Sequence, residues 1–199
     1  MRYAFCDFKI LEVLKKCQIH SFPVDCERLL DIYCCNCIPY SSLSSREQLL
    51  CHQFPKDAVL VNDKGFLKLF YDDSQCDTRI RFSWMHGLGH FVLGHLDPMY
   101  SASLSEEEKE QEANYFASNL LAPHLAIYYS GLRTPEVVAD VFSISNKTAS
   151  YALKNFYRWF AYHQNSRKSL NFVDFQLHEH LYPKEKLPDF SISASISPL

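Results

Sequence analysis

The sequence predicts an α+β domain that is mostly helical, with a small β-sheet and a helix-turn-helix-like segment toward its C-terminal end. Residues 58–71 hold two apolar runs separated by turn residues, which is typical of a β-hairpin. Residues 106–121 combine an acidic start with apolar residues at helical spacing. Residues 137–153 have the apolar spacing of two helices joined by a short turn.

The composition excludes several classes of protein. Of 199 residues, 47% are hydrophobic and 22% charged, which is ordinary for a globular chain. A formal net charge of −3 excludes a strongly basic nucleic-acid coat protein. No apolar run approaches the ~18–20 residues that span a bilayer, and Asp7 and Lys9 interrupt any secretory signal. We therefore expect a cytoplasmic protein with no membrane partner.

Eight cysteines fit that compartment as reduced thiols rather than disulfides. Cys34, Cys35 and Cys37 lie close together, but the sequence has no second pair at CxxC spacing to complete a zinc site. Buried or half-exposed thiols are therefore favoured over a zinc knuckle.

The first half of the chain predicts two helices and a hairpin. A helix is expected over residues 7–18, and Pro23 opens a second one, since its missing N–H has no partner in a first helical turn. Residues 58–61 and 66–71 predict strands joined by the turn 62–65. Phe8, Leu11 and Leu14 are expected on one face of the first helix, and the core candidates of the second are Leu29, Leu30 and Ile32.

The second half predicts more helices. Ser83 is a good N-cap for a helix that ends near Leu93, and residues 97–105 are expected to form a loop. The helix over residues 106–121 is ended by Pro123. Two further helices are expected within residues 135–160, with a turn at 143–145 in which Ser145 caps the second helix, and an irregular tail is expected from residue 183.

Two histidines carry the first sign of chemistry. His86 and His90 stand four residues apart on a predicted helix, a rotation of about 400°, so both imidazoles leave the same face. Two imidazole nitrogens about one turn apart can bind one Zn²⁺. The same spacing also arises by coincidence on helix surfaces, so a zinc site is indicated only if the chain offers a third ligand.

The helix over residues 106–121 offers that third ligand. Glu112 precedes the apolar stripe of this helix and can point inward where two helices meet. Glu110 is the fallback ligand. His95 lies about 140° off the face of His90 unless Gly94 redirects the chain, so it is expected beside the ligands rather than on the metal. Asn114 is a further candidate for such a supporting position.

Two linked motifs resemble a known family. Arg-Phe-Ser-x-x-His-x-Leu-Gly-His, followed by Glu-x-Glu-Ala-Asn-x-Phe-Ala-x-x-Leu-Leu-x-Pro, is similar to the ImmA/IrrE family of bacterial and phage metallopeptidases. The resemblance covers roughly residues 20–155. It implies a zincin-like fold and a thermolysin-like zinc site with His86, His90 and Glu112 as ligands. It also implies a partner, a helix-turn-helix repressor that such a peptidase cleaves to switch on a mobile element, prophage or stress response.

The sequence departs from the family at one position. The family pattern is His-Glu-x-x-His, in which the glutamate is the general base, whereas this chain has Gly87. Glycine can neither take nor pass a proton, and inside a helix it costs about 1 kcal/mol relative to alanine. Gly87 is either an introduced inactivating change or the residue of a natural pseudo-peptidase that keeps the metal and binds without cutting. We expect metal binding to survive and hydrolysis to be lost or greatly reduced.

The helix-turn-helix-like segment has two interpretations. Nearby basic residues, among them Lys147 and Lys154, favour DNA binding weakly. Packing on the peptidase domain or docking of a protein partner is the simpler interpretation, so direct DNA binding is not expected.

These expectations combine into one organisation. Residues 1–130 form a zincin-like metallopeptidase domain, residues 131–165 the helix-turn-helix-like segment packed on it, and residues 166–199 an extension and tail. The function expected is that of a zinc metalloendopeptidase acting on a repressor, impaired at Gly87. The alternative is a non-catalytic regulator that binds a repressor or another protein without cleavage.

Overall fold

The computed structural model describes residues 2–52, 57–166 and 170–191. These residues form helices and one small sheet, which confirms the predicted α+β class. The chain divides into two compact units that interleave in sequence. The first contains Met1–Cys6 and Asp25–Ala117, and the second contains Asp7–Val24 and Ser118–Leu199. The boundaries expected near residues 130 and 165 remain predictions.

The sheet of the first unit has the strand order β1-β3-β2. β2 (Ala58–Asp63) and β3 (Phe66–Tyr71) pair antiparallel, which confirms the predicted hairpin. Lys64 and Gly65 both have positive φ at the turn, as a two-residue hairpin loop requires. β1 (Cys35–Pro39) pairs parallel to β3 and was not predicted, because five residues with three polar or thiol side chains carry little strand pattern.

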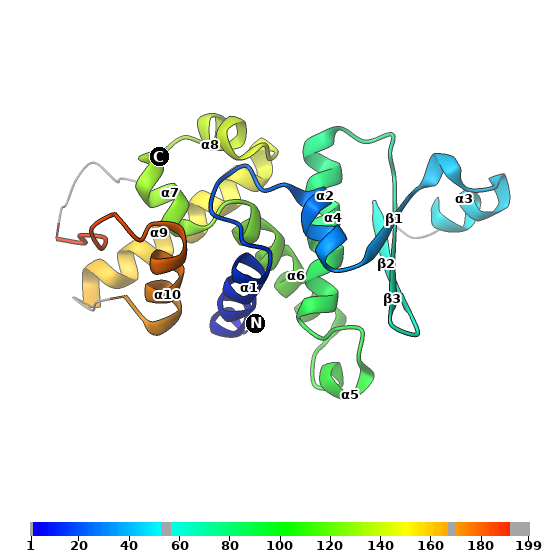
Figure 1. The fold of residues 1–199 in the computed structure, drawn as a ribbon, viewed down its shortest axis with the longest axis horizontal. Coiled ribbons are helices and arrows are strands. Elements are labelled where there is room, and N and C mark those ends of the chain that lie inside the picture. The colour runs from blue at the N-terminus through cyan, green and yellow to red at the C-terminus, as the bar shows by residue number, and fades with distance from the viewer. Residues whose placement is uncertain (1, 53–56, 167–169, 192–199) are drawn as a thin grey trace. The chain divides into compact units, whose positions relative to one another are not determined.

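α4 (Asp77–Val92) lies beside this sheet and contacts β2 and β3 (Figure 1). The expected start at Ser83 is wrong, because Cys76 is the N-cap and its carbonyl oxygen accepts from the backbone N–H groups of Arg79 and Ile80. Ser83 is instead buried inside the helix. A serine can cap a helix, but its small side chain also fits on the buried face in the middle of a helix.

The remaining elements of the first unit are short. Asp25 caps α2 (Cys26–Ile32) by accepting from the N–H of Arg28, so Pro23 precedes the cap and is not in the first turn as expected. The expected loop over residues 97–105 contains a four-residue helix. The other elements are η1 (Tyr40–Ser42), α3 (Ser45–His52) and α5 (Pro98–Ser101).

α6 (Glu106–Leu121) has the bounds predicted for it. Ser105 and Glu108 cap its start reciprocally, since the Ser105 Oγ accepts from the Glu108 N–H and the Glu108 carboxylate accepts from the Ser105 N–H. Its apolar stripe is fully buried. Residues 106–117 belong to the first unit and the last four to the second.

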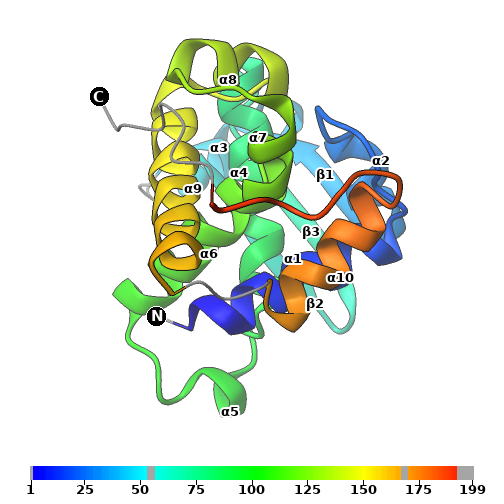
Figure 2. The ribbon, with the colours of Figure 1, turned by 90° about the vertical axis from the view of Figure 1, so that its left-hand side faces the viewer.

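The second unit holds the helix-turn-helix-like segment (Figure 2). α8 (Pro135–Phe142) ends at Ser143, whose φ is 51°, and α9 (Asn146–Ser166) begins after it. Ser145 accepts from the N–H of Thr148, which confirms its predicted capping role. α7 (His124–Ser130), α10 (Phe172–Leu181) and most of α1 (Tyr3–Lys16) complete this unit, and α10 was not predicted.

A buried carboxylate joins three helices of the second unit. Asp174 on α10 accepts hydrogen bonds from His124 Nε2 at 2.9 Å, Trp159 Nε1 at 2.8 Å and Asn171 Nδ2 at 2.9 Å, and His163 Nε2 lies 3.3 Å away. Burial alone raises the pKa of Asp174, but His124 and these hydrogen bonds outweigh it and hold the pKa far below its ordinary value. The same ion pair raises the pKa of the buried His124 against the effect of its own burial.

Replacing Asp174 by alanine is expected to lower the free energy of unfolding by about 3–5 kcal/mol, because it leaves buried partners without an acceptor. The lowered pKa of Asp174 stabilises the folded state above about pH 3.9, and the raised pKa of His124 stabilises the folded state below about pH 6.5. The loss should therefore be largest between these values and shrink on either side. Urea unfolding from pH 3 to 9 checks this, with the exposed Asp140→Ala as control. A pH-independent loss contradicts the ion pair.

Candidate metal centre

α4 and α6 bring three metal-ligating side chains together. His86 Nε2 lies 3.1 Å from His90 Nε2, as expected for two residues one turn apart on α4. The Glu110 carboxylate of α6 spans both rings, with Oε2 3.3 Å from His86 Nε2 and Oε1 3.3 Å from His90 Nε2. Among the described residues these three form the group whose ligand atoms all lie within 4.8 Å of one another.

The spacing of these donor atoms fits zinc. Ligand atoms about 2.0–2.1 Å from a tetrahedral zinc ion are about 3.3 Å apart, close to the three separations in this site. The set consists of two imidazole nitrogens and one carboxylate, and all three side chains are half-buried. Three protein ligands leave a fourth position open, which is the arrangement of a catalytic rather than a structural zinc site.

Gly89 allows α4 and α6 to approach closely enough for this geometry. A Cβ atom at position 89 would lie 2.9 Å from Phe116 Cδ1 and 3.5 Å from Ala113 Cα, both on α6. Phe116 is fully buried, so it has little room to give way. The absence of a side chain at Gly89 therefore sets the helix separation that brings Glu110 to the histidines.

Glu112, the third ligand expected from the sequence, has other partners. Its carboxylate accepts from His95 Nε2 at 3.1 Å and from Arg2, whose Nε and Nη2 lie at 3.0 and 2.7 Å. Burial alone raises the pKa of Glu112, but the bonds from Arg2 and His95 outweigh it and lower the pKa to about 2. The structure thus places Glu110, the fallback residue, with His86 and His90. Glu112 instead contacts His95, which in turn contacts His90.

His95 connects Glu112 to the donor group. Gly94 has a φ of 78°, which ends the helical path and turns His95 back toward His90. His95 Nδ1 lies 3.1 Å from His90 Nδ1, on the side of the His90 ring opposite the donor nitrogen. Burial lowers the pKa of His95 despite the opposing effect of Glu112, so the ring is neutral at pH 7.

These contacts determine the tautomers. The ionised Glu112 only accepts, so the proton of His95 sits on Nε2 and its Nδ1 accepts from His90 Nδ1–H. The lone pair of His90 is then on Nε2, facing Glu110 and His86. By contrast, His86 Nδ1 is buried and has no hydrogen-bond partner in the described part of the chain. Of the two histidines, His90 is the one with this support.

Position 87 faces the sheet. A Cβ atom at Gly87 would lie 2.8 Å from Leu69 Cδ1 and 3.6 Å from Leu60 Cβ. The space in which a side chain at position 87 would begin is thus lined by leucines of β3 and β2. Asn114, expected beside the ligands, is exposed to solvent.

A protein-family model described as the IrrE N-terminal-like domain, a peptidase family, matches residues 42–154, more than half of the chain. The chain belongs to the ImmA/IrrE metallopeptidase family. Comparison with curated proteins gave no match. The matched residues include the whole donor group and Gly87. No helix in the described ranges of this ImmA/IrrE chain is both long and apolar enough to cross a bilayer.

Sequence reasoning did not find Arg2. It lies 110 residues from Glu112 in the chain, and no spacing rule connects an arginine before the first helix to a glutamate on α6. The choice between Glu110 and Glu112 was likewise beyond the sequence, because both carboxylates are within one turn of the same helix.

Substitution of Gly89 by alanine should separate α4 from α6. We expect a loss of about 1–3 kcal/mol in the free energy of unfolding, since the new methyl group meets the buried ring of Phe116. Zinc affinity should fall with it. Gly87→Ala is the matched control, because alanine gains the same ~1 kcal/mol of helix preference at both positions, whereas the methyl group at 87 meets the end of the Leu69 side chain and no atom of α6. Urea unfolding and zinc competition measure both; equal effects would contradict the role of Gly89.

Proposed function

We propose that this chain binds one zinc ion through His86, His90 and Glu110 and retains the protein-binding role of its family with hydrolysis strongly reduced. The observation that carries the metal site is the donor group itself, with its three separations of 3.1–3.3 Å. When bound, zinc supplies a Lewis acid that polarises a peptide carbonyl and activates water. Two imidazoles and a carboxylate with an open position favour zinc, although Mn²⁺ and Fe²⁺ suit similar ligands.

The loss of hydrolysis follows from position 87. Gly87 offers no group to accept a proton from water or deliver it to the leaving amine, and general-base contributions are typically ~10²–10⁴-fold. Glu110 faces both histidines, and Glu112 is engaged by Arg2 and His95. Neither carboxylate is therefore placed to replace the missing base. The chain is proposed to hold its partner at a metal site that turns over slowly or not at all.

The partner we propose is a helix-turn-helix repressor protein, the class that the family resemblance implies. The net charge of −3 gives no general attraction to DNA, so the helix-turn-helix-like pair α8–α9 is assigned to packing and protein docking rather than duplex binding.

Paired glutamine variants on α6 distinguish the ligand from its neighbour. Glu110→Gln should remove nearly all zinc from a chain that otherwise binds close to one ion, because the ligand itself is changed. Glu112→Gln should retain the site and weaken it by the ~10–100-fold typical of a supporting residue. Metal analysis gives the zinc content of each variant, and competition with a chromophoric chelator gives its zinc affinity. His90→Ala serves as the metal-free control. Zinc lost only in Glu112→Gln would make Glu112 the ligand.

Restoring the base should restore cleavage. Gly87→Glu combined with Leu69→Val, which removes the Cδ1 atom 2.8 Å from the new Cβ, is expected to raise proteolysis by ~10²–10⁴-fold over the chain as written. Gly87→Glu alone should gain less, because Leu69 must first move. Mass spectrometry of newly formed N-termini in an extract of the source cells measures the gain, with new termini expected in helix-turn-helix repressors. A folded, zinc-loaded double variant without new termini would contradict the proposal.

A further inference from the structure

We propose that Arg2 is a positioning residue of the metal centre, which holds His90 in its metal-binding orientation and tautomer through Glu112 and His95. The inference deepens the proposed function and rests on zinc binding by His86, His90 and Glu110. It assigns to Arg2 an effect on a ligand that it does not touch.

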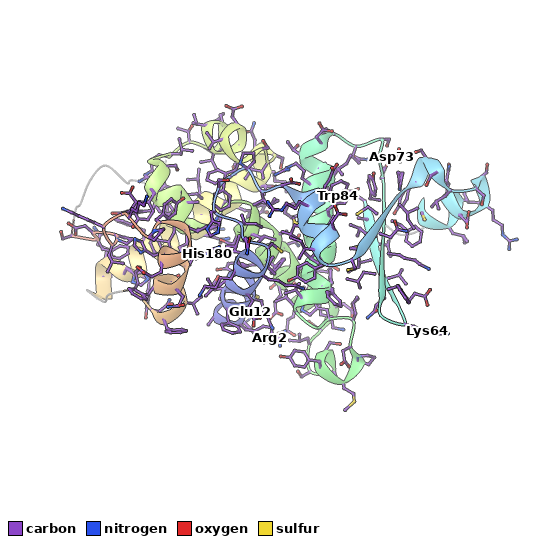
Figure 3. The ribbon with its side chains drawn as sticks, in the orientation of Figure 1. Arg2, Glu12, Lys64, Asp73, Trp84 and His180 are labelled. Atoms are coloured by element: carbon purple, nitrogen blue, oxygen red, sulfur yellow. The ribbon has the colours of Figure 1, made fainter. Side chains whose placement is uncertain are left out.

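The first step is the grip of Arg2 on Glu112. Its guanidinium donates from Nε to Oε1 at 3.0 Å and from Nη2 to Oε2 at 2.7 Å, and its backbone N–H donates to Oε1 at 2.9 Å. This two-pronged pairing fixes the plane of the carboxylate as well as its position. Figure 3 labels Arg2 at the start of α1. The Glu112 side chain is fully buried, so an unpaired carboxylate there would be costly.

The second step passes this orientation to the ligand. Oε2 of Glu112, which receives Nη2 of Arg2, is also the atom that lies 3.1 Å from His95 Nε2. His95 is itself buried, and its Nδ1 faces His90 Nδ1 at 3.1 Å. A carboxylate held by Arg2 thereby keeps the His95 proton on Nε2 and the His90 proton on Nδ1, so that the lone pair of His90 is on Nε2, the atom proposed to bind metal.

The third step is the contrast between the two histidines. His86 Nδ1 has no hydrogen-bond partner in the described ranges, so no comparable series of contacts orients that ring. The preorganisation of the site therefore depends mainly on His90. Removal of Arg2 should therefore weaken metal binding, although Arg2 is not one of the proposed ligands.

The test compares zinc affinities and tautomers in a set of variants. Arg2→Ala removes two of the three bonds to Glu112 and should weaken zinc binding by ~10–100-fold, and Arg2→Lys should recover part of that loss. His95→Ala interrupts the series, so the double variant Arg2→Ala/His95→Ala should bind zinc no more weakly than His95→Ala alone. Arg79 lies on α4, the helix that carries both histidines, and forms an exposed ion pair with Asp57. Arg79→Ala is the control, and its zinc affinity should stay within about twofold of the wild-type value.

A second readout needs no metal. Two-bond ¹⁵N–¹H spectra of the metal-free chain should show His90 protonated on Nδ1 and His95 on Nε2, and mixed tautomers in Arg2→Ala. A wild-type chain that binds no zinc would overturn both the proposed function and this inference. Unchanged zinc affinity in Arg2→Ala, effects of Arg2→Ala and His95→Ala that multiply in the double variant, or the opposite tautomers in wild type would overturn this inference alone.

Discussion

The candidate site depends on the close approach of α4 to α6 at Gly89. The two histidines would share a face of α4 in any case, because their spacing guarantees it. The third donor arrives only because a residue without a side chain lets the ring of Phe116 and the backbone of Ala113 pack directly against α4. Glu110 then reaches both imidazoles, and Glu112, two residues on, is directed to His95 and Arg2. The close packing at Gly89 thus brings Glu110, the ligand we propose, to the histidines and leaves Glu112 with His95 and Arg2.

The two glycines of the motif have different consequences. Gly89 is required by the space between two helices, which is a matter of packing. Gly87 faces Leu69 and Leu60 of the sheet, which closely line the position where a base would start. The glycine at position 87 is therefore accompanied by leucine packing around it. In the function we propose, a chain with this arrangement keeps metal binding without the proton transfer that hydrolysis requires.

The sequence predicts those parts of the fold that depend on local pattern. The hairpin turn at Lys64-Gly65, the bounds of α6 and the capping role of Ser145 all follow from neighbouring residues. It fails where distant residues decide. β1 forms because β3 offers it a partner. α4 begins at Asp77, upstream of Ser83, where the carbonyl oxygen of Cys76 accepts from the N–H groups of Arg79 and Ile80. Arg2 and Glu112 meet across 110 residues, and no pattern in the sequence announces that pair.

The proposed metal centre depends on the identity of its three ligands, and a crystal structure of the zinc-loaded chain measures that identity most directly. Diffraction data collected on both sides of the zinc absorption edge should show one anomalous peak, about 2.0–2.2 Å from His86 Nε2, His90 Nε2 and a Glu110 oxygen. Glu112 should remain paired with Arg2 and His95. A peak bound to Glu112 in place of Glu110, or no peak between the two histidines, would contradict the account.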